Sequence, residues 1–288
     1  MFTMRRRNVL IIAGAALALI AATAGTTAAV PAVRHIVSAI LNLPDRLPSL
    51  AENSQVHFEL GADDYAHDVS TLLPAAIARV ETVHGRPFAH PVTVGVYTTP
   101  EAYAAANPLG STVSVGVTFF GRVNLSPKLF RPQHKRLPAI LTHELSHAQL
   151  EGWIGENAFT HLPNWFKEGL AVMVSGGGGA ELVSEEEARA AIQRGEQIAI
   201  EDAESLQSLG DIRFDRAPAK TGPSWYPVVL AYRQAGMFVS YLRESDGPAF
   251  DRMMNAILDG RPFAEALAVG YYKDLHSLWR EFALTNVE

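Results

Sequence analysis

Apolar and polar positions divide the chain into two parts with different periodicities. The first part shows strand-like alternation and β-branched runs around two helical segments, whereas the second part is helical almost throughout. Strands are predicted at 55–60, 90–99 and 111–127, the last of them broken or bent at Gly116 and Gly121. Helices are predicted at 63–85, 100–107, 136–151, 162–174, 183–195, 224–245, 248–258, 262–268 and 274–285. The order predicts an α+β fold, a small N-terminal mixed sheet with helices followed by a mostly helical C-terminal half.

Proline and glycine mark the expected boundaries between these segments. Residues 42–54 (NLPDRLPSLAENS) contain prolines and little periodicity, so we expect 31–54 to be a linker. The SGGGG run at 175–179 indicates a flexible break, and 210–224 indicates a long loop. We therefore expect one domain over 55–288. Its parts would be an α/β part (55–135), a central helical part (136–175) and a second helical part (183–288).

The first thirty residues (1–30) have the pattern of an export signal. A basic start is followed by the apolar run Val9–Ala22 and then by small residues, which is the order of a secretory leader. Cleavage sites of the A-x-A type fit at 22–24 and 27–29. The alternative is an uncleaved membrane anchor over Val9–Val30. The RRRNVL start also resembles a twin-arginine signal, an alternative to ordinary Sec export. We expect a periplasmic or secreted protein, or one anchored by this segment.

Composition and charge exclude some classes of function. Of the 288 residues, 48% are hydrophobic and the formal net charge is −6, which is typical of a globular acidic chain. An acidic body has no electrostatic reason to bind nucleic acid. The chain has no cysteine, which excludes disulfides and thiol chemistry.

The stretch LTHELSHAQLEG (141–152) carries the clearest chemical signal. His143 and His147 lie four apart on a predicted helix of about 137–151 that would end at Gly152, so both imidazoles point the same way and can share one ion. Glu144 lies about 100° round the helix, from where its carboxylate reaches a water on that ion. This is the H-E-x-x-H arrangement of zinc peptidases.

A second stretch, LPNWFKEGLAVMVS (162–175), begins 15 residues after His147. It places Glu168 on another predicted helix, and three protein ligands plus water complete a tetrahedral catalytic zinc site. The alternative for Glu168 is an exposed helix glutamate that pairs with Lys167 or with no residue. We expect it to be the third ligand, and we expect Gly169 to let its helix approach the first one closely.

Together, H-E-L-S-H and W-F-K-E-G-L-A resemble the gluzincin metallopeptidases, in particular the peptidase MA-like proteins related to thermolysin and to the aminopeptidase N-like enzymes. The resemblance covers roughly 55–285 and implies a zincin-like fold. It also implies that Glu144 is the general base and that the segment 115–126 is a strand at the upper rim of the cleft, able to pair an extended substrate. The zinc ligands that it implies are His143, His147 and Glu168.

Two departures from the family pattern change what the resemblance supports. Thermolysin-like enzymes carry an aspartate four residues after the ligand glutamate that supports a histidine, and Val172 stands at that position here. Support for the histidines must therefore come from elsewhere. The G-x-M-E-N segment of the aminopeptidase N-like enzymes has no match in 111–127, which removes the main support for amino-terminal trimming.

The segment 225–244 offers a hydrogen-bond donor for the negative charge that hydrolysis builds on a carbonyl oxygen. In relatives a helical tyrosine at a comparable distance past the ligand glutamate has this role, and Tyr232 fits best, with Tyr226 next. The alternative is a core tyrosine that packs beside Met237 and Phe238.

These observations predict a zinc-dependent metallopeptidase that hydrolyses peptides or proteins in the bacterial envelope or outside the cell. One alternative is a catalytically silent envelope protein that uses the same fold for binding or scaffolding. The other is a zinc hydrolase that acts on a non-peptide amide or ester.

Overall fold

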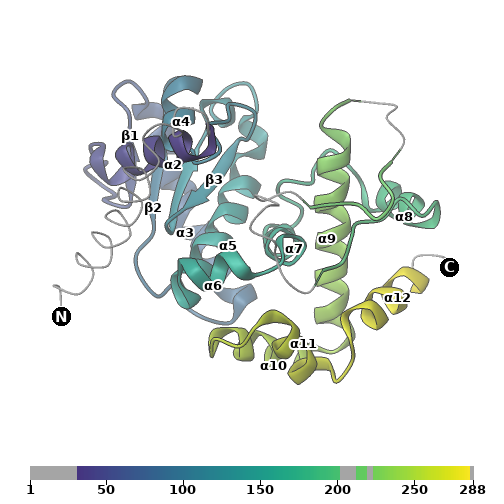
Figure 1. Ribbon diagram of the computed structural model, residues 1–288. Coiled ribbons are helices and arrows are strands. Elements are labelled where there is room, and N and C mark those ends of the chain that lie inside the picture. The colour runs from purple at the N-terminus through teal and green to yellow at the C-terminus, as the bar shows by residue number, and fades with distance from the viewer. Residues whose placement is uncertain (1–30, 202–211, 219–222, 286–288) are drawn as a thin grey trace, which may run out of the picture.

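A computed structural model describes residues 31–201, 212–218 and 223–285. The leader predicted at 1–30 lies outside these residues. A small sheet with its covering helices forms one end of the molecule, and a group of helices arranged around the long α9 (Tyr226–Ser245) forms the other (Figure 1). Among the helices of these segments, none combines the length and the apolar character that crossing a bilayer requires.

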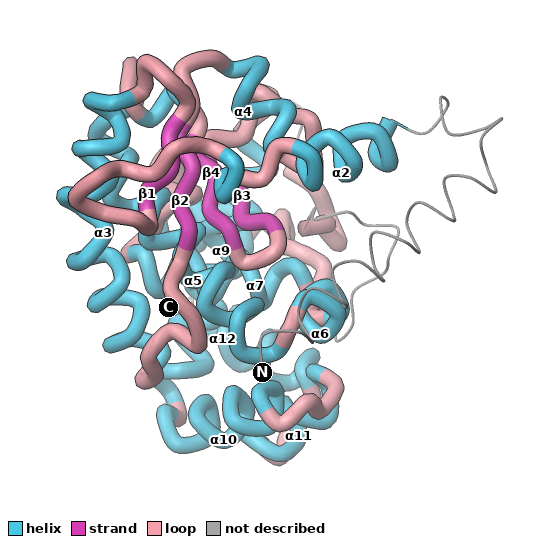
Figure 2. The backbone as a smooth tube through the Cα atoms, turned by 90° about the vertical axis from the view of Figure 1, so that its left-hand side faces the viewer, coloured by secondary structure: helices cyan, strands magenta, loops and turns pink. Residues whose placement is uncertain are grey.

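The sheet has four short strands, β1 (Val56–Phe58), β2 (Thr93–Val96), β3 (Gly116–Phe119) and β4 (Arg122–Leu125), in the order β1-β2-β4-β3 (Figure 2). β1 pairs with β2 and β2 with β4 in parallel, whereas β3 and β4 form an antiparallel hairpin in which Thr118 faces Val123. The hairpin turns at Phe120 and Gly121, both with positive φ. The mixed sheet and the break at Gly121 are thus confirmed, and β3 forms one edge of the sheet, with β1 at the other.

Helices cover both faces of the sheet. The helices α3 (Asp63–His84) and α5 (Leu137–Ile154) pack on one face, against the valines and leucine of the central strands. α4 (Pro100–Ala106) packs on the other face, where Tyr97 and Tyr103 form a small separate core. The buried Asn124 on that face accepts a 2.6 Å hydrogen bond from the Tyr97 hydroxyl, which satisfies its carbonyl oxygen.

The segment 31–54 differs from the predicted linker. It contains α2 (Pro31–Leu41) and a 3₁₀ turn (Pro44–Arg46), and Ser38 of α2 donates a hydrogen bond to the backbone of α4. Leu50 is buried in the main core. Prolines begin both elements, and α2 packs on α4 whereas the 3₁₀ turn packs on β2, so low periodicity alone did not indicate a free segment.

The central helices differ from prediction mainly at their ends. α5 continues past Gly152 to Ile154 and stops at Gly155, which has φ +82°, because only the second glycine takes a conformation that a helix cannot continue. An unpredicted short helix, α6 (Glu156–His161), follows it, and α7 (Asn164–Ser175) begins after Pro163.

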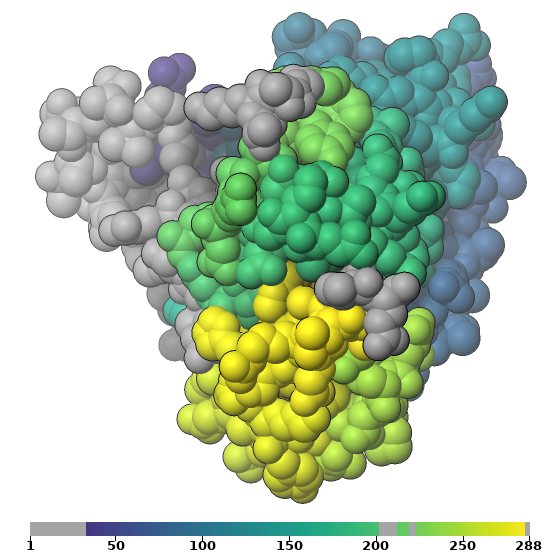
Figure 3. Space-filling view, turned by 90° about the vertical axis from the view of Figure 1, so that its right-hand side faces the viewer, coloured from purple at the N-terminus to yellow at the C-terminus, as the bar shows by residue number. Residues whose placement is uncertain are grey.

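The C-terminal half is helical as predicted, and the α+β fold class is confirmed. Its helices are α8 (Glu185–Gln193), α9, α10 (Gly247–Leu258), α11 (Phe263–Tyr271) and α12 (Leu275–Thr285). Aromatic rings join them to α7, since Phe238 of α9 contacts both Trp165 and Trp279 at centroid distances of 5.2 and 4.9 Å. Figure 3 shows this end of the molecule, with the last helices in yellow below the green segment that contains α8.

Candidate metal centre

α5 places two imidazoles on one side of a deeply buried helix. Leu141 and Leu145 are inaccessible to solvent, which fixes the helix in the core, and His143 and His147 are buried on another face. The rings meet edge to face with centroids 4.8 Å apart. As predicted from the spacing of four, the two side chains point to the same place.

α7 brings Glu168 to the same point. The helix lies between α5 and α9, and Trp165 and Phe166 anchor its first turn in the core. Gly169 has another role than the predicted approach to α5: a Cβ there would lie 2.5 Å from the Ala235 carbonyl oxygen of α9. The glycine therefore lets α7 and α9 pack closely, and this packing sets where Glu168 points.

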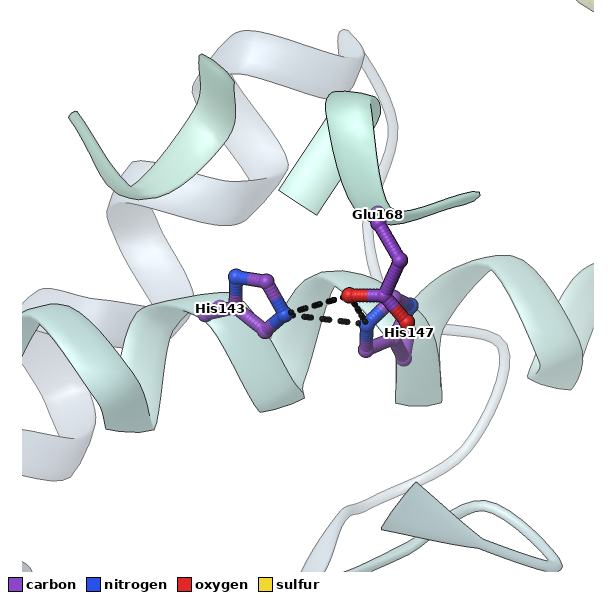
Figure 4. Close-up of side chains that lie close together, drawn as sticks. All are labelled: His143, His147 and Glu168. Atoms are coloured by element: carbon purple, nitrogen blue, oxygen red, sulfur yellow. Dashed lines mark hydrogen bonds and ion pairs between the residues drawn. The ribbon is translucent and has the colours of Figure 1, made fainter. Parts of the chain in front are cut away.

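The three side chains converge on one point (Figure 4). His143 Nε2 lies 3.1 Å from His147 Nε2 and 3.2 Å from Glu168 Oε2, and the third distance, from His147 Nε2 to Glu168 Oε2, is 3.5 Å. Tetrahedral zinc with bonds of about 2.0–2.1 Å has ligand atoms roughly 3.3 Å apart. The three atoms thus already form one face of a tetrahedron, and the group can hold a metal ion.

The backbone of the glycine-rich segment fixes the tautomer of His143. Its Nδ1 lies 2.9 Å from the Gly178 carbonyl oxygen, which only accepts, so Nδ1 carries the hydrogen. With a metal bound, Nε2 of the neutral ring would then be the ligand atom on the side of His147 and Glu168. The support that Val172 does not supply therefore comes from a main-chain carbonyl.

Burial and the neighbouring charges shift the pKa values of the site residues in opposite directions. Burial lowers the pKa of His143, but the carboxylates of Glu168 and Glu144 outweigh it, so the pKa is raised overall. Burial would raise the pKa of Glu168, yet the nearby His147 and His143 hold it well below its usual range. Glu168 is therefore an anion at neutral pH, as a metal ligand must be.

Glu144 lies between the helix and the edge strand. Thr118 Oγ1 of β3 is 2.9 Å from both the Glu144 carboxylate oxygen Oε2 and its main-chain oxygen, and it donates its one hydrogen to this pair of acceptors. A Cβ at Gly116 would lie 2.7 Å from Oε1, so only glycine leaves room for this carboxylate. Burial raises the pKa of Glu144. The carboxylate is thus held against the strand, buried and next to the cluster.

Aromatic rings line the cluster. Tyr232 of α9 stacks on His143, with the ring planes 3° from parallel and the centroids 6.2 Å apart. Phe159 of α6 meets the His147 ring edge to face at 6.0 Å. Tyr226, the next candidate, lies at the start of α9 beside the Arg194 guanidinium. Of the two tyrosines, the structure brings Tyr232 to the histidines.

Gly116, Thr118, Gly178 and Arg233 support the site from a strand, a loop and a helix, and none of them was predicted to belong to it. The alternation of β3 places Gly116 and Thr118 on one face, so a signal for that pair existed. Gly178 acts through its backbone, which leaves no signal in side-chain chemistry.

Comparison of the chain with protein-family models, with curated proteins and with solved structures gives no match.

Proposed function

We propose that this chain is a zinc-dependent peptidase with His143, His147 and Glu168 as metal ligands and Glu144 as general base. The single observation that supports it most is the triangle of ligand atoms with a buried carboxylate beside it. Two imidazoles and a carboxylate suit zinc in a hydrolytic site with an open position. Bound zinc would supply a Lewis acid and an activated water.

Side chains and backbone of the protein would then carry out proton transfer, charge stabilisation and substrate binding. Glu144 accepts a proton on a carboxylate oxygen and delivers it to the leaving nitrogen. Tyr232, on the His143 side of the cluster, donates its phenolic hydrogen to the carbonyl oxygen that gains negative charge. The edge strand β3 adds an extended substrate by main-chain hydrogen bonds next to Glu144, which favours a peptide over a small ester or amide. The predicted leader places this activity outside the cytoplasm.

The test combines metal analysis with a peptide-library digest of the full-length protein. We expect about one zinc per chain, cleavage of library peptides and loss of cleavage with a chelator. Glu144→Gln should keep its zinc and lose at least about 100-fold in turnover, since a positioned base contributes roughly 10²–10⁴-fold.

The outcomes separate the alternatives. Normal turnover by a zinc-loaded Glu144→Gln protein contradicts the role of the base. Zinc without cleavage of any peptide favours the binding or scaffolding function, and cleavage of amide or ester reporters alone favours the non-peptide hydrolase. If zinc-free protein still cleaves peptides in the presence of a chelator, the metal centre has no part in the function.

A further inference from the structure

The SGGGG run, predicted to be a flexible break, is a folded loop that we call the glycine loop (176–183). Gly176 ends α7 with φ +70°, and the Gly177 amide donates to the Val172 carbonyl oxygen at 2.8 Å. Ser175 Oγ accepts a hydrogen bond from the Gly178 amide at 2.9 Å. Ala180 and Val183 are inaccessible to solvent. The loop is therefore held by hydrogen bonds to the end of α7 and by the burial of apolar side chains.

The loop passes against the metal cluster because its glycines lack side chains. A Cβ at Gly178 would lie 2.5 Å from the Ala139 carbonyl oxygen of α5. A Cβ at Gly179, which has φ +85°, would lie 3.3 Å from both the His143 and the Tyr232 rings. This close approach brings the Gly178 carbonyl oxygen to His143 Nδ1.

Arg233 of α9 fixes the far side of the loop. Its Nε donates to the Val183 carbonyl oxygen at 2.8 Å and its Nη2 to the Ala180 carbonyl oxygen at 2.9 Å. The guanidinium also covers Gly177, where a Cβ would meet it at 3.2 Å. A planar fork that binds two carbonyls at once fixes their orientation, which lysine cannot do. Arg233 follows Tyr232 directly, so neighbouring residues of α9 contact the loop and the ligand ring.

We propose that the glycine loop, clamped by Arg233, positions His143 for metal binding and that Arg233 thereby sets metal affinity without contacting the metal. The Gly178 carbonyl oxygen accepts the hydrogen bond from the imidazole that a side-chain acceptor receives in other histidine–metal sites. The position of this carbonyl depends on Arg233. Arg233 is a positioning residue that acts through Gly178 on the tautomer and orientation of one imidazole. This inference uses the metal centre of the proposed function and requires no hydrolytic activity.

Zinc titration of the full-length, metal-stripped protein against a competing chelator tests the proposal. Arg233→Met keeps the aliphatic stem and removes all donors, and we expect zinc binding to weaken about 10- to 100-fold, as for the loss of other groups that support metal-bound histidines. Arg233→Lys should weaken it less. Arg189→Met, which removes an exposed arginine from an ion pair with Glu185 on α8, is the matched control and should bind as the wild type does.

A spectroscopic measurement separates this positioning role from general loosening of the fold. In ¹⁵N spectra of the zinc-loaded proteins, His143 of the wild type should show an Nδ1–H signal that exchanges slowly with solvent, and Arg233→Met should show faster exchange of this hydrogen. Folded Arg233→Met protein with wild-type zinc affinity, or with an unchanged His143 Nδ1–H signal, overturns the proposal. Should Arg233→Met fail to fold, wild-type affinity in Arg233→Lys overturns it, and weaker binding supports it. Because zinc alone is the probe, the result holds whether or not the chain cleaves peptides.

Discussion

At the scale of single residues, the contact between Thr118 and Glu144 connects the edge strand to the proposed chemistry. Glu144 is buried, and the Thr118 hydroxyl donates a hydrogen bond to its carboxylate. A buried carboxylate depends strongly on such a donor, because the hydrogen bond both orients it and offsets part of its desolvation. Thr118 therefore holds the proposed general base beside the strand that, in the proposed function, would pair with a substrate.

Replacing Thr118 by valine keeps the shape and removes the hydroxyl. Loss of a hydrogen bond to a charged group costs roughly 1.5–3 kcal/mol, so we expect kcat to fall about 10- to 100-fold. KM and zinc content should stay near wild type, because neither depends on this hydroxyl. Steady-state kinetics with metal analysis would measure this, and Thr118→Ser should recover most of the activity. Equal loss in the serine and valine variants would exclude the hydrogen bond as the cause.

At the scale of elements, the packing of α7 on α9 decides where Glu168, the proposed third ligand, lies. The two helices approach through a pair of glycines: Gly169 faces the Ala235 carbonyl, and a Cβ at Gly236 would lie 2.4 Å from Val172. Val172 thus packs between these two helices. The close contact aligns Glu168 with the histidines of α5.

A matched pair of glycine-to-alanine substitutions tests this contact. Gly169→Ala places a methyl against backbone and should destabilise the protein by about 1–3 kcal/mol, as overpacking does. Gly152→Ala is the control: it lies in the last turn of α5, where a Cβ would meet no atom of the described chain within 4 Å. It should stabilise by about 0.5–1 kcal/mol through helix propensity. Urea denaturation midpoints would show both, and a Gly169→Ala protein as stable as Gly152→Ala contradicts the close packing.

At the scale of the whole molecule, the site joins segments that are far apart in the sequence. The edge strand supplies Thr118, α5 supplies both histidines and Glu144, α7 supplies Glu168, and the glycine loop with α9 supports His143. A metal bound here would therefore link the sheet end of the molecule to the helical end (Figure 1). Binding that requires the folded arrangement must stabilise that arrangement.

Zinc should accordingly raise the thermal midpoint of the metal-free protein. At a free concentration of 100 times Kd the stabilisation is about 2.7 kcal/mol, which corresponds to roughly 5–10 °C for a chain of this size. Glu168→Gln should lose most of the shift, whereas Glu265→Gln, at an exposed position on α11, should keep it. Scanning calorimetry with and without zinc would measure the effect. A full shift in Glu168→Gln would show that zinc binds elsewhere.

The sequence by itself determined the fold class and most helices. It also predicted that His143, His147 and Glu168 could form a metal site. Helical periodicity and a spacing of four are local properties, so His143 and His147 share a face whatever the rest of the chain does. Composition and turn residues likewise predicted the mixed sheet at one end and the helices at the other.

Only the tertiary structure decided how the site is completed. Glu168 meets the histidines because α7 packs against α9. Gly178 supports His143 through a backbone carbonyl, which every residue type has and which the sequence therefore does not indicate. The segment 31–54 and the glycine loop looked unstructured because proline and glycine weaken local periodicity. Both are fixed by contacts with residues distant in sequence, such as Ser38 with α4 and Arg233 with the loop, and a local pattern does not encode such contacts.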